Sequence, residues 1–424
     1  EPQTAKLAAR TGELYAAVEE NEAALSWYRR AYAFEPESEE LFRAIDEVLI
    51  RLSRGDDPDT FDDARREERV DHYRVALDNV FDDERRVAHL HVIADLQRSL
   101  GRDDDAIATY NELLDIDERN TSALDAQTEL YRKAERHQDL ADLYERRADL
   151  ADSPEEAAPF RLELAKLLGQ DEDARDRALD QLEAIVAETP DHPQAVSELE
   201  AMLGDAQRKQ RVVDVLRPLY QGQDNWEGLI RLNEERLKLV DYPMDKVEIL
   251  ADSASLWEDR GQDEEKAFEI TRQAFLLAPD HEDTRKNLER LAEELDTWDA
   301  LATAYDQAAD KVDDEFVKRQ LLHALGEVCD EQLDDPRRAL DALGKLSALD
   351  PSDPEPLEKM DTLCMLLSDW ETLVGVLRQK ADNAPGDEDR AALLRRLGAI
   401  RGDMLASELV VGQLPERRTK TPSN

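Results

Sequence analysis

Histidine, cysteine and clustered aspartate are the side chains of this sequence that could bind a metal or attack a substrate. Of seven histidines, only His89 and His91 lie close together along the chain. Residues two apart on a helix point away from each other, whereas helical metal pairs are three or four apart, so the spacing predicts no metal pair. His192 and His281 each follow a proline by two residues, which predicts positions in turns between helices.

Three acidic clusters, at residues 56–63, 103–105 and 171–173, could be considered for calcium. A calcium loop needs regularly spaced oxygen ligands with a glycine at the bend, and none of the three segments has that pattern. Acidic side chains near the start of a helix are stabilised by the positive end of the helix dipole. We therefore interpret the clusters as turns that lead into helices.

The two cysteines, Cys329 and Cys364, do not make a disulfide framework. Cys329 lies at a position that the repeat described below fills with a bulky core residue, so we expect a buried, unreactive thiol. A bond between the two would need neighbouring helices to approach unusually closely. The sequence contains no glycine-rich phosphate loop, nucleophile elbow or dinucleotide-binding fingerprint. It therefore predicts no catalytic residue, no cofactor and no metal, and a protein that is not an enzyme.

The balance of charge restricts the partners. The 424 residues include 101 acidic and 55 basic side chains, for a net charge of −46. Such a surface repels phosphate backbones and anionic lipids, so nucleic acid and membrane surfaces are poor partners. Because the acid is spread along the whole chain, solubility or adaptation to a salty or high-GC source is the favoured interpretation; a docking surface for a basic segment is the alternative. No apolar run approaches the length of a membrane span.

The secondary-structure elements that would position a functional site recur along the sequence with a period of 72 residues. Residues of three types recur with this spacing: Trp226, Trp298 and Trp370; Ala267 and Ala339; Pro279 and Pro351. A finer pattern of a small residue, a usually bulkier one three positions later, then alanine, then proline or an acid begins at Gly12, Ala94, Ala165, Ala254 and Gly326, and a further unit opens at Gly398. Two antiparallel helices approach closely only where a small side chain lies at the crossing, and proline ends a helix. The pattern therefore predicts helix hairpins.

This hairpin resembles the tetratricopeptide repeat. The resemblance rests on Gly12, Tyr15, Ala24, Tyr28, Ala31 and Pro36, and it extends in degenerate form to about residue 406. Gln97, Glu118, Thr271 and Arg401 depart from the family pattern, and most first helices are one residue longer before the turn. The resemblance implies an all-α fold, an α-α superhelix (a tetratricopeptide-like solenoid) of roughly 22 helices.

A second hairpin completes each 72-residue unit. We expect a helix over 354–367 and another opened by Asp369 and Trp370, with Asp369 as its N-cap. Apolar residues follow each tryptophan at intervals of three or four, a one-sided stripe typical of a packed helix. The three periodic tryptophans are therefore predicted to be core residues.

Two irregular spacings divide the array. Ala24 and Ala106 are 82 residues apart, and the excess falls in a polar loop at 53–63. Ala178 and Ala267 are 89 apart, which predicts one additional helix near residues 204–225. We therefore expect an N-terminal array (1–203) with the inserted loop, a C-terminal array (204–406) with the additional helix near its start, and a tail or linker (407–424).

The resemblance implies a protein–protein interaction scaffold or adaptor that binds a peptide or helix on its concave face. The alternative is a sensory or regulatory arm of a larger multidomain protein, non-catalytic itself. Some family members clamp a C-terminal carboxylate, but the matching positions here include Lys6, Ala9 and Glu13, which do not support that clamp.

The charge favours a basic or amphipathic protein or peptide as the partner. Leu393, Leu394 and Leu397 lie in a last helix without its pair, so end-to-end self-association is a further expectation. The sequence starts at Glu1 without methionine or a leader, from which we expect a fragment or processed form. The two lone cysteines suit a reducing compartment, so we expect a cytoplasmic location.

Overall fold

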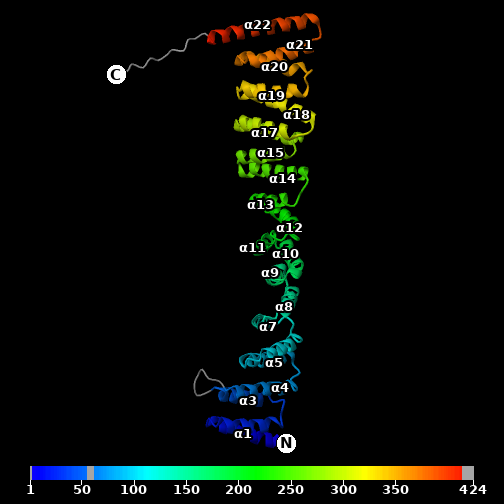
Figure 1. Cartoon of the computed structure of the whole chain (residues 1–424). Helices are drawn as coiled ribbons and strands as arrows, with labels where there is room; N and C mark the ends of the chain where they lie inside the picture. The colour runs from blue at the N-terminus through cyan, green and yellow to red at the C-terminus, as the bar shows by residue number, and fades with distance from the viewer. Residues whose placement is uncertain (1, 55–61, 413–424) are drawn as a thin grey trace, which may run out of the picture. The chain divides into compact units, whose positions relative to one another are not determined.

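The computed structural model describes residues 2–54 and 62–412. Within these ranges the chain forms 22 α-helices and no β-strand, which confirms the predicted all-α array of helix pairs (Figure 1). None of the helices in the described part combines the length and the apolar character that crossing a membrane requires. The helices divide into two compact units, Glu1–Met202 and Leu203–Asn424.

In the first unit, consecutive helices pack against each other as antiparallel hairpins. Its helices are α1 (Pro2–Ala17), α2 (Asn21–Tyr32), α3 (Glu39–Ser53), α4 (Asp63–Leu77), α5 (Asp83–Ser99), α6 (Asp103–Leu114), α7 (Thr121–Lys133), α8 (His137–Leu150), α9 (Pro154–Gly169), α10 (Arg175–Glu188) and α11 (Pro193–Met202).

The second unit repeats the arrangement. Its helices are α12 (Lys209–Gly222), α13 (Trp226–Leu237), α14 (Pro243–Leu256), α15 (Glu264–Leu277), α16 (Glu282–Leu295), α17 (Trp298–Lys311), α18 (Glu315–Glu327), α19 (Pro336–Leu349), α20 (Pro354–Leu367), α21 (Trp370–Asn383) and α22 (Asp387–Gly412). Three helices, α11 to α13, lie in the chain between α10 and α14, where two helices separate the corresponding hairpins elsewhere.

Small residues lie at the helix crossings, as the repeat pattern predicts. A Cβ atom on Gly12 of α1 would lie 2.7 Å from Cδ1 of Tyr28, whose ring is itself buried against α1. Ala24, Ala94 and Ala254 have at most 1% of their surface exposed. Any larger side chain at these positions would force the two helices apart.

The extra residue of the longer first helices is absorbed at their C-terminal ends. α14 and α18 continue into short π-helical turns, η2 (Trp257–Gly261) and η3 (Val328–Gln332), while α9 is followed by a 3-10 turn, η1 (Glu172–Ala174). A π turn accommodates one additional residue without breaking the helix. The crossing residue upstream therefore keeps its place despite the insertion.

The prolines and histidines between helices lie in turns, as their spacing predicts. α15 ends two residues before Pro279, and His281 then caps α16 by accepting a hydrogen bond at Nδ1 from the Thr284 N–H (3.3 Å). His192 accepts in the same way from the Ala195 N–H at the start of α11 (3.2 Å). The two histidines are thus turn residues, as predicted, and their rings replace the usual serine or aspartate cap.

The prediction of core positions for the periodic tryptophans is wrong. Trp226 and Trp298 are only partly buried, and Trp370 is 37% exposed. Each is the first residue of its helix, so it lies at the end of the hairpin, away from the crossing. The core positions are filled one and two turns later, by residues such as Leu301 and Tyr305 of α17.

The insertion and the tail lie partly outside the described residues. Of the predicted loop at 53–63, residues 55–61 are not described, and Asp62 caps α4 by accepting from the Ala64 and Arg65 N–H groups. The predicted tail was expected to begin at residue 407, but α22 continues as helix to Gly412. The division into arrays of residues 1–203 and 204–406 remains a proposal.

α22 is attached to the preceding helices through one buried carboxylate. Asp361 of α20 is 6% exposed and accepts hydrogen bonds from Lys380 of α21 (2.8 Å) and from both terminal nitrogens of Arg396 of α22 (2.7 Å each). Burial opposes ionisation, but these hydrogen bonds lower the pKa of Asp361 below its usual value. Leu397 packs into the core beside this group. The face of α22 that carries Leu397 is therefore covered, whereas Leu394 is 48% exposed, and end-to-end self-association stays a prediction.

A stack of three rings joins α3, α4 and α5 in the first unit. The Phe42 ring lies between the imidazoles of His72 and His89, at centroid distances of 4.5 Å and 4.7 Å. His72 Nε2 also lies 3.1 Å from the Phe42 carbonyl oxygen, a distance that a neutral ring can bridge with its N–H. Burial lowers the pKa of both histidines. The stack therefore favours the neutral form of both imidazoles.

Replacing Gly12 with alanine is expected to lower the free energy of unfolding of the first hairpin by about 1–2 kcal/mol, since the new methyl group overlaps the Tyr28 ring. Gly375→Ala in α21 is the matched control. Nothing lies within 4 Å of its Cβ position, so it should stabilise its helix by about 0.5–1 kcal/mol. Urea unfolding followed by circular dichroism measures both. Equal effects of the two substitutions would contradict the close crossing at Gly12.

The stability of the first unit is expected to fall as the pH drops below about 6.5, the ordinary histidine pKa in an unfolded chain. The folded His72 and His89 resist protonation, so the unfolded state binds more protons in this range and is favoured. Above that pH the contribution is fully present. A His72→Gln, His89→Gln variant should show a flatter dependence of its urea midpoint between pH 7 and 5 than the parent chain. Parallel curves for the two proteins would refute this assignment.

Candidate functional site

The residues with chemical potential are dispersed over the fold. Among the residues that the structure describes, no group of three or more His, Cys, Asp or Glu side chains is placed to hold a metal ion. His89 lies in the ring stack, whereas His91 lies 2.9 Å from the Ser122 hydroxyl. The two histidines therefore point to different neighbours, as their spacing predicts.

Both cysteines are buried and free of disulfide. Burial raises the pKa of the Cys329 thiol, and it raises the pKa of Cys364 to about 11. Both shifts disfavour the reactive thiolate, and the burial of Cys329 agrees with the predicted core position. Two of the three acidic clusters lie at helix starts: residues 103–105 form the first turn of α6, and Asp171 caps η1 by accepting from the Asp173 N–H. Most of the third, at 56–63, lies outside the described residues.

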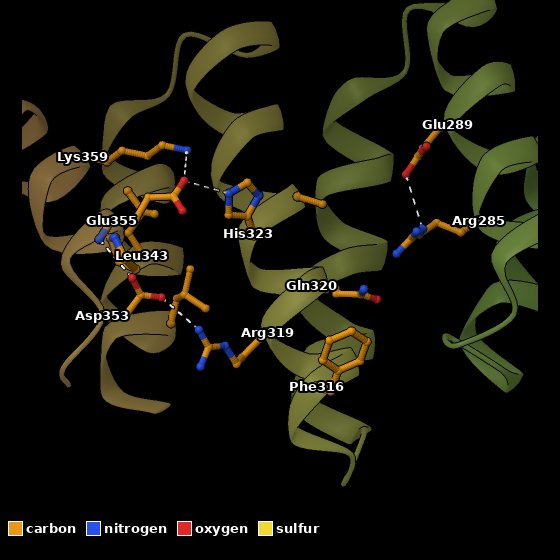
Figure 2. A pocket seen from close by; sticks show the side chains of 13 residues that line it. Arg285, Glu289, Phe316, Arg319, Gln320, His323, Leu343, Asp353, Glu355 and Lys359 are labelled. Carbon is orange, nitrogen blue, oxygen red and sulfur yellow. Dashed lines mark hydrogen bonds and ion pairs between the residues drawn. The ribbon is translucent and has the colours of Figure 1, made fainter. Parts of the chain in front are cut away.

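A groove of about 420 Å³ opens in the second unit and is the candidate site (Figure 2). Its walls are three helices that each begin a hairpin, α16, α18 and α20, and Leu343 and Leu346 of α19 form part of its apolar lining. We call it the inner groove. Its composition is mixed, because arginine, lysine and glutamate side chains surround apolar surface.

Ion pairs connect α18 to α20 on one side of the inner groove. Arg319 binds Asp350 (3.1 Å) and Asp353 (2.9 Å), while Glu355 lies 3.3 Å from His323 and 3.5 Å from Lys359. The hydrogen bond from His323, with the charge of Lys359, lowers the pKa of Glu355 below its usual value. These charges are partnered within the protein and fix the spacing of the two helices.

On the other side, α18 presents Gln320 and Phe316 toward α16, which carries Arg285 and Glu289 (Figure 2). Arg285 of α16 has one ionic neighbour, Glu289, at 3.8 Å, which is beyond hydrogen-bond distance. That glutamate also accepts from the Tyr305 hydroxyl. The Gln320 side chain is exposed to solvent. Phe316, next to them, is 70% exposed.

The sequence did not single out Arg285, Phe316 or Gln320. They fall between the positions that define the repeat, and nothing in their spacing distinguishes them from other outward-facing residues. An exposed aromatic residue on a first helix, near a basic residue on the previous first helix, is the signal that could have found them. That signal needs helix boundaries and faces, which a degenerate repeat does not define.

Residues 123–158 match the family model described as the tetratricopeptide repeat. The match covers the hairpin α7–α8 and the start of α9. This is a second hairpin of the 72-residue unit, the type that the sequence pattern presents as more divergent. The hairpin that begins at Gly12, on which the resemblance was founded, is not the one matched. No curated protein matches the sequence.

Solved structures with similarity to the chain include yeast Tom70 (13% identity, 95% of this chain and 96% of that one, TM-score 0.22). They also include the tetratricopeptide domain of P58(IPK) (12% identity, 94% and 99%, TM-score 0.23). A third is a tetratricopeptide repeat protein from Parabacteroides merdae ATCC 43184 (14% identity, 68% and 99%, TM-score 0.27).

The family match and the arrangement of hairpins agree with each other. The described residues form helix pairs with small residues at their crossings, and one of these pairs carries the family's own sequence pattern. The chain therefore carries a tetratricopeptide repeat at residues 123–158 and is a tetratricopeptide-like repeat protein built of helix hairpins.

Proposed function

We propose that this protein is a non-catalytic interaction scaffold whose inner groove binds a segment of a partner protein. Tetratricopeptide-like arrays generally serve as protein–protein interaction scaffolds. The observation that supports the inner groove as the binding site is the row formed by Arg285, Gln320 and the exposed Phe316. A partner that covers the exposed ring can also exchange the water on the neighbouring N–H groups for direct hydrogen bonds.

The chemistry of the groove defines the bound segment. Arg285 and Gln320 both offer N–H groups, so the segment should present a carbonyl or carboxylate oxygen toward them. Phe316, Leu343 and Leu346 offer apolar surface, which a large apolar side chain of the segment would cover. An amphipathic helix or extended peptide meets both requirements. In this groove the amphipathic character of the partner matters more than basic charge, because acids and bases are both present.

Selection of peptides from a random 12-residue phage library on the intact chain tests this proposal. The selected peptides are then titrated by fluorescence anisotropy against the parent protein, Phe316→Ala and Arg285→Gln. Each substitution should weaken binding about tenfold, because it removes a buried ring or a charge-assisted hydrogen bond from the complex.

Leu366→Ala is the matched control, since Leu366 of α20 is also 70% exposed but does not line the inner groove. It should change the affinity by less than about twofold. Equal losses for Phe316→Ala and Leu366→Ala, or unchanged binding by both groove variants, would contradict the assignment. Circular dichroism spectra that match the parent protein confirm that the variants are folded.

A further inference from the structure

A second cavity, of about 380 Å³, lies in the first unit at the turn ends of the helices. It is bounded by α3, α4 and α5 and by two connecting segments, residues 33–38 and 78–82. Tyr32, Phe42, Tyr73 and Val92 contribute apolar surface. We call it the turn pocket. It shares no residue with the inner groove, so an argument about one does not depend on the other.

The aromatic wall of the turn pocket is preformed. Phe42 is held between two imidazoles, and the Tyr73 ring meets it edge-on at a centroid distance of 4.9 Å. The Tyr73 hydroxyl donates to Asp46 (3.0 Å), which is also paired with Arg69. The aromatic wall therefore offers apolar contact to a ligand, whereas much of the remaining lining is polar or charged.

Phe81 stands at the rim of this pocket with 85% of its surface exposed, the highest value among the large hydrophobic residues of the described chain. The adjacent Val80 also lines the pocket. An exposed ring beside an apolar cavity is a common feature of a binding surface, because contact with a partner removes both from water together.

The two segments at the rim are strongly acidic. Residues 35–40 (EPESEE) contain four glutamates and no base, and residues 78–84 (DNVFDDE) contain four acids and no base. Two arginines line the pocket, Arg43 and Arg85, but both are paired with Glu39. Glu37 is exposed and has no partner among the described side chains. The aromatic wall of the turn pocket is thus bordered on two sides by excess negative charge.

The aromatic wall, the exposed Phe81 and the acidic rim together restrict what kind of molecule can bind in the turn pocket. A second copy of the chain would bring its own net charge of −46 to an acidic rim, which opposes contact. A small apolar ligand would make no use of the rim. We propose that the turn pocket binds a basic amphipathic segment of a partner protein, with a large apolar side chain inserted beside Phe81 and flanking lysine or arginine side chains on the two acidic turns.

The test uses the intact chain and three labelled helical peptides of equal length, titrated by fluorescence anisotropy at about 50 mM and 300 mM salt. One peptide is amphipathic and built of leucine and lysine, one has glutamate in place of lysine, and one has serine in place of leucine. The leucine–lysine peptide should bind at least about tenfold more tightly than either of the others, and salt should weaken it.

Variants locate the site. Phe81→Ala and the double variant Glu37→Lys, Asp83→Lys should each weaken the leucine–lysine peptide about tenfold. Asp149→Lys is the control for charge, because Asp149 of α8 is an exposed acid of the same unit outside the turn pocket. It should leave the affinity within about twofold. All four substituted positions are exposed, so we expect the variants to fold like the parent chain. Circular dichroism spectra and melting temperatures that match those of the parent chain verify this.

Three results would overturn the proposal. The first is no binding of the leucine–lysine peptide by the parent chain. The second is equal binding of the glutamate or serine peptide. The third is a loss of affinity for the leucine–lysine peptide with Asp149→Lys as large as that with the pocket variants. That result would mean that the acidic protein attracts the basic peptide without a specific site. Because the inner groove is untouched by these variants, Phe316→Ala serves as a separate check: its effect on phage-selected peptides tests the proposed function alone.

Discussion

The structure depends on close contact between antiparallel helices at small side chains. Each helix satisfies its own backbone hydrogen bonds, so only side chains can hold one helix to the next. Gly12 against Tyr28 is the tightest of these crossings, and alanines such as Ala24 and Ala94 make others with no exposed surface. The crossing sets the distance between helices, and the turns and surface residues adjust to it. This explains why insertions are accommodated at helix ends, in π turns whose positions repeat after about 72 residues.

Part of the unusual acidity has a structural role. The hydroxyl of a second-helix tyrosine donates to an acid on the first helix of the same hairpin in three places: Tyr73 to Asp46, Tyr110 to Asp95 and Tyr305 to Glu289. Many arginines bind acids on neighbouring helices, as Arg98 does with Glu129. Exposed pairs of this kind contribute little individually. Their main consequence is that the bases are largely occupied, so the acids left over define the electrostatic character of the surface.

The two cavities therefore differ in a way that follows from this arrangement. The inner groove lies along three first helices, where acids and bases are paired with one another, Arg285 with Glu289 among them. The turn pocket lies where chain segments connect helices, and there the sequence places acids without bases. A scaffold with both surfaces could hold two segments of different chemistry.

The sequence by itself determined the helical class, the hairpins and their crossings, since small residues and prolines at fixed spacing have few other uses. It also placed His192 and His281 in turns and a buried thiol at Cys329. It misjudged the tryptophans, because periodicity shows that residues are equivalent but not how deeply they are buried. Trp298 and Trp370 recur because each begins a helix at the end of a hairpin. Tyr305 and Leu377, further along the same helices, fill the core. Only the tertiary structure decided which outward-facing residues share a surface. Arg285 and Phe316 are 31 positions apart, and Phe42 and Phe81 are 39 apart. Their proximity depends on the angle between successive hairpins, which many side chains set jointly and no local pattern encodes.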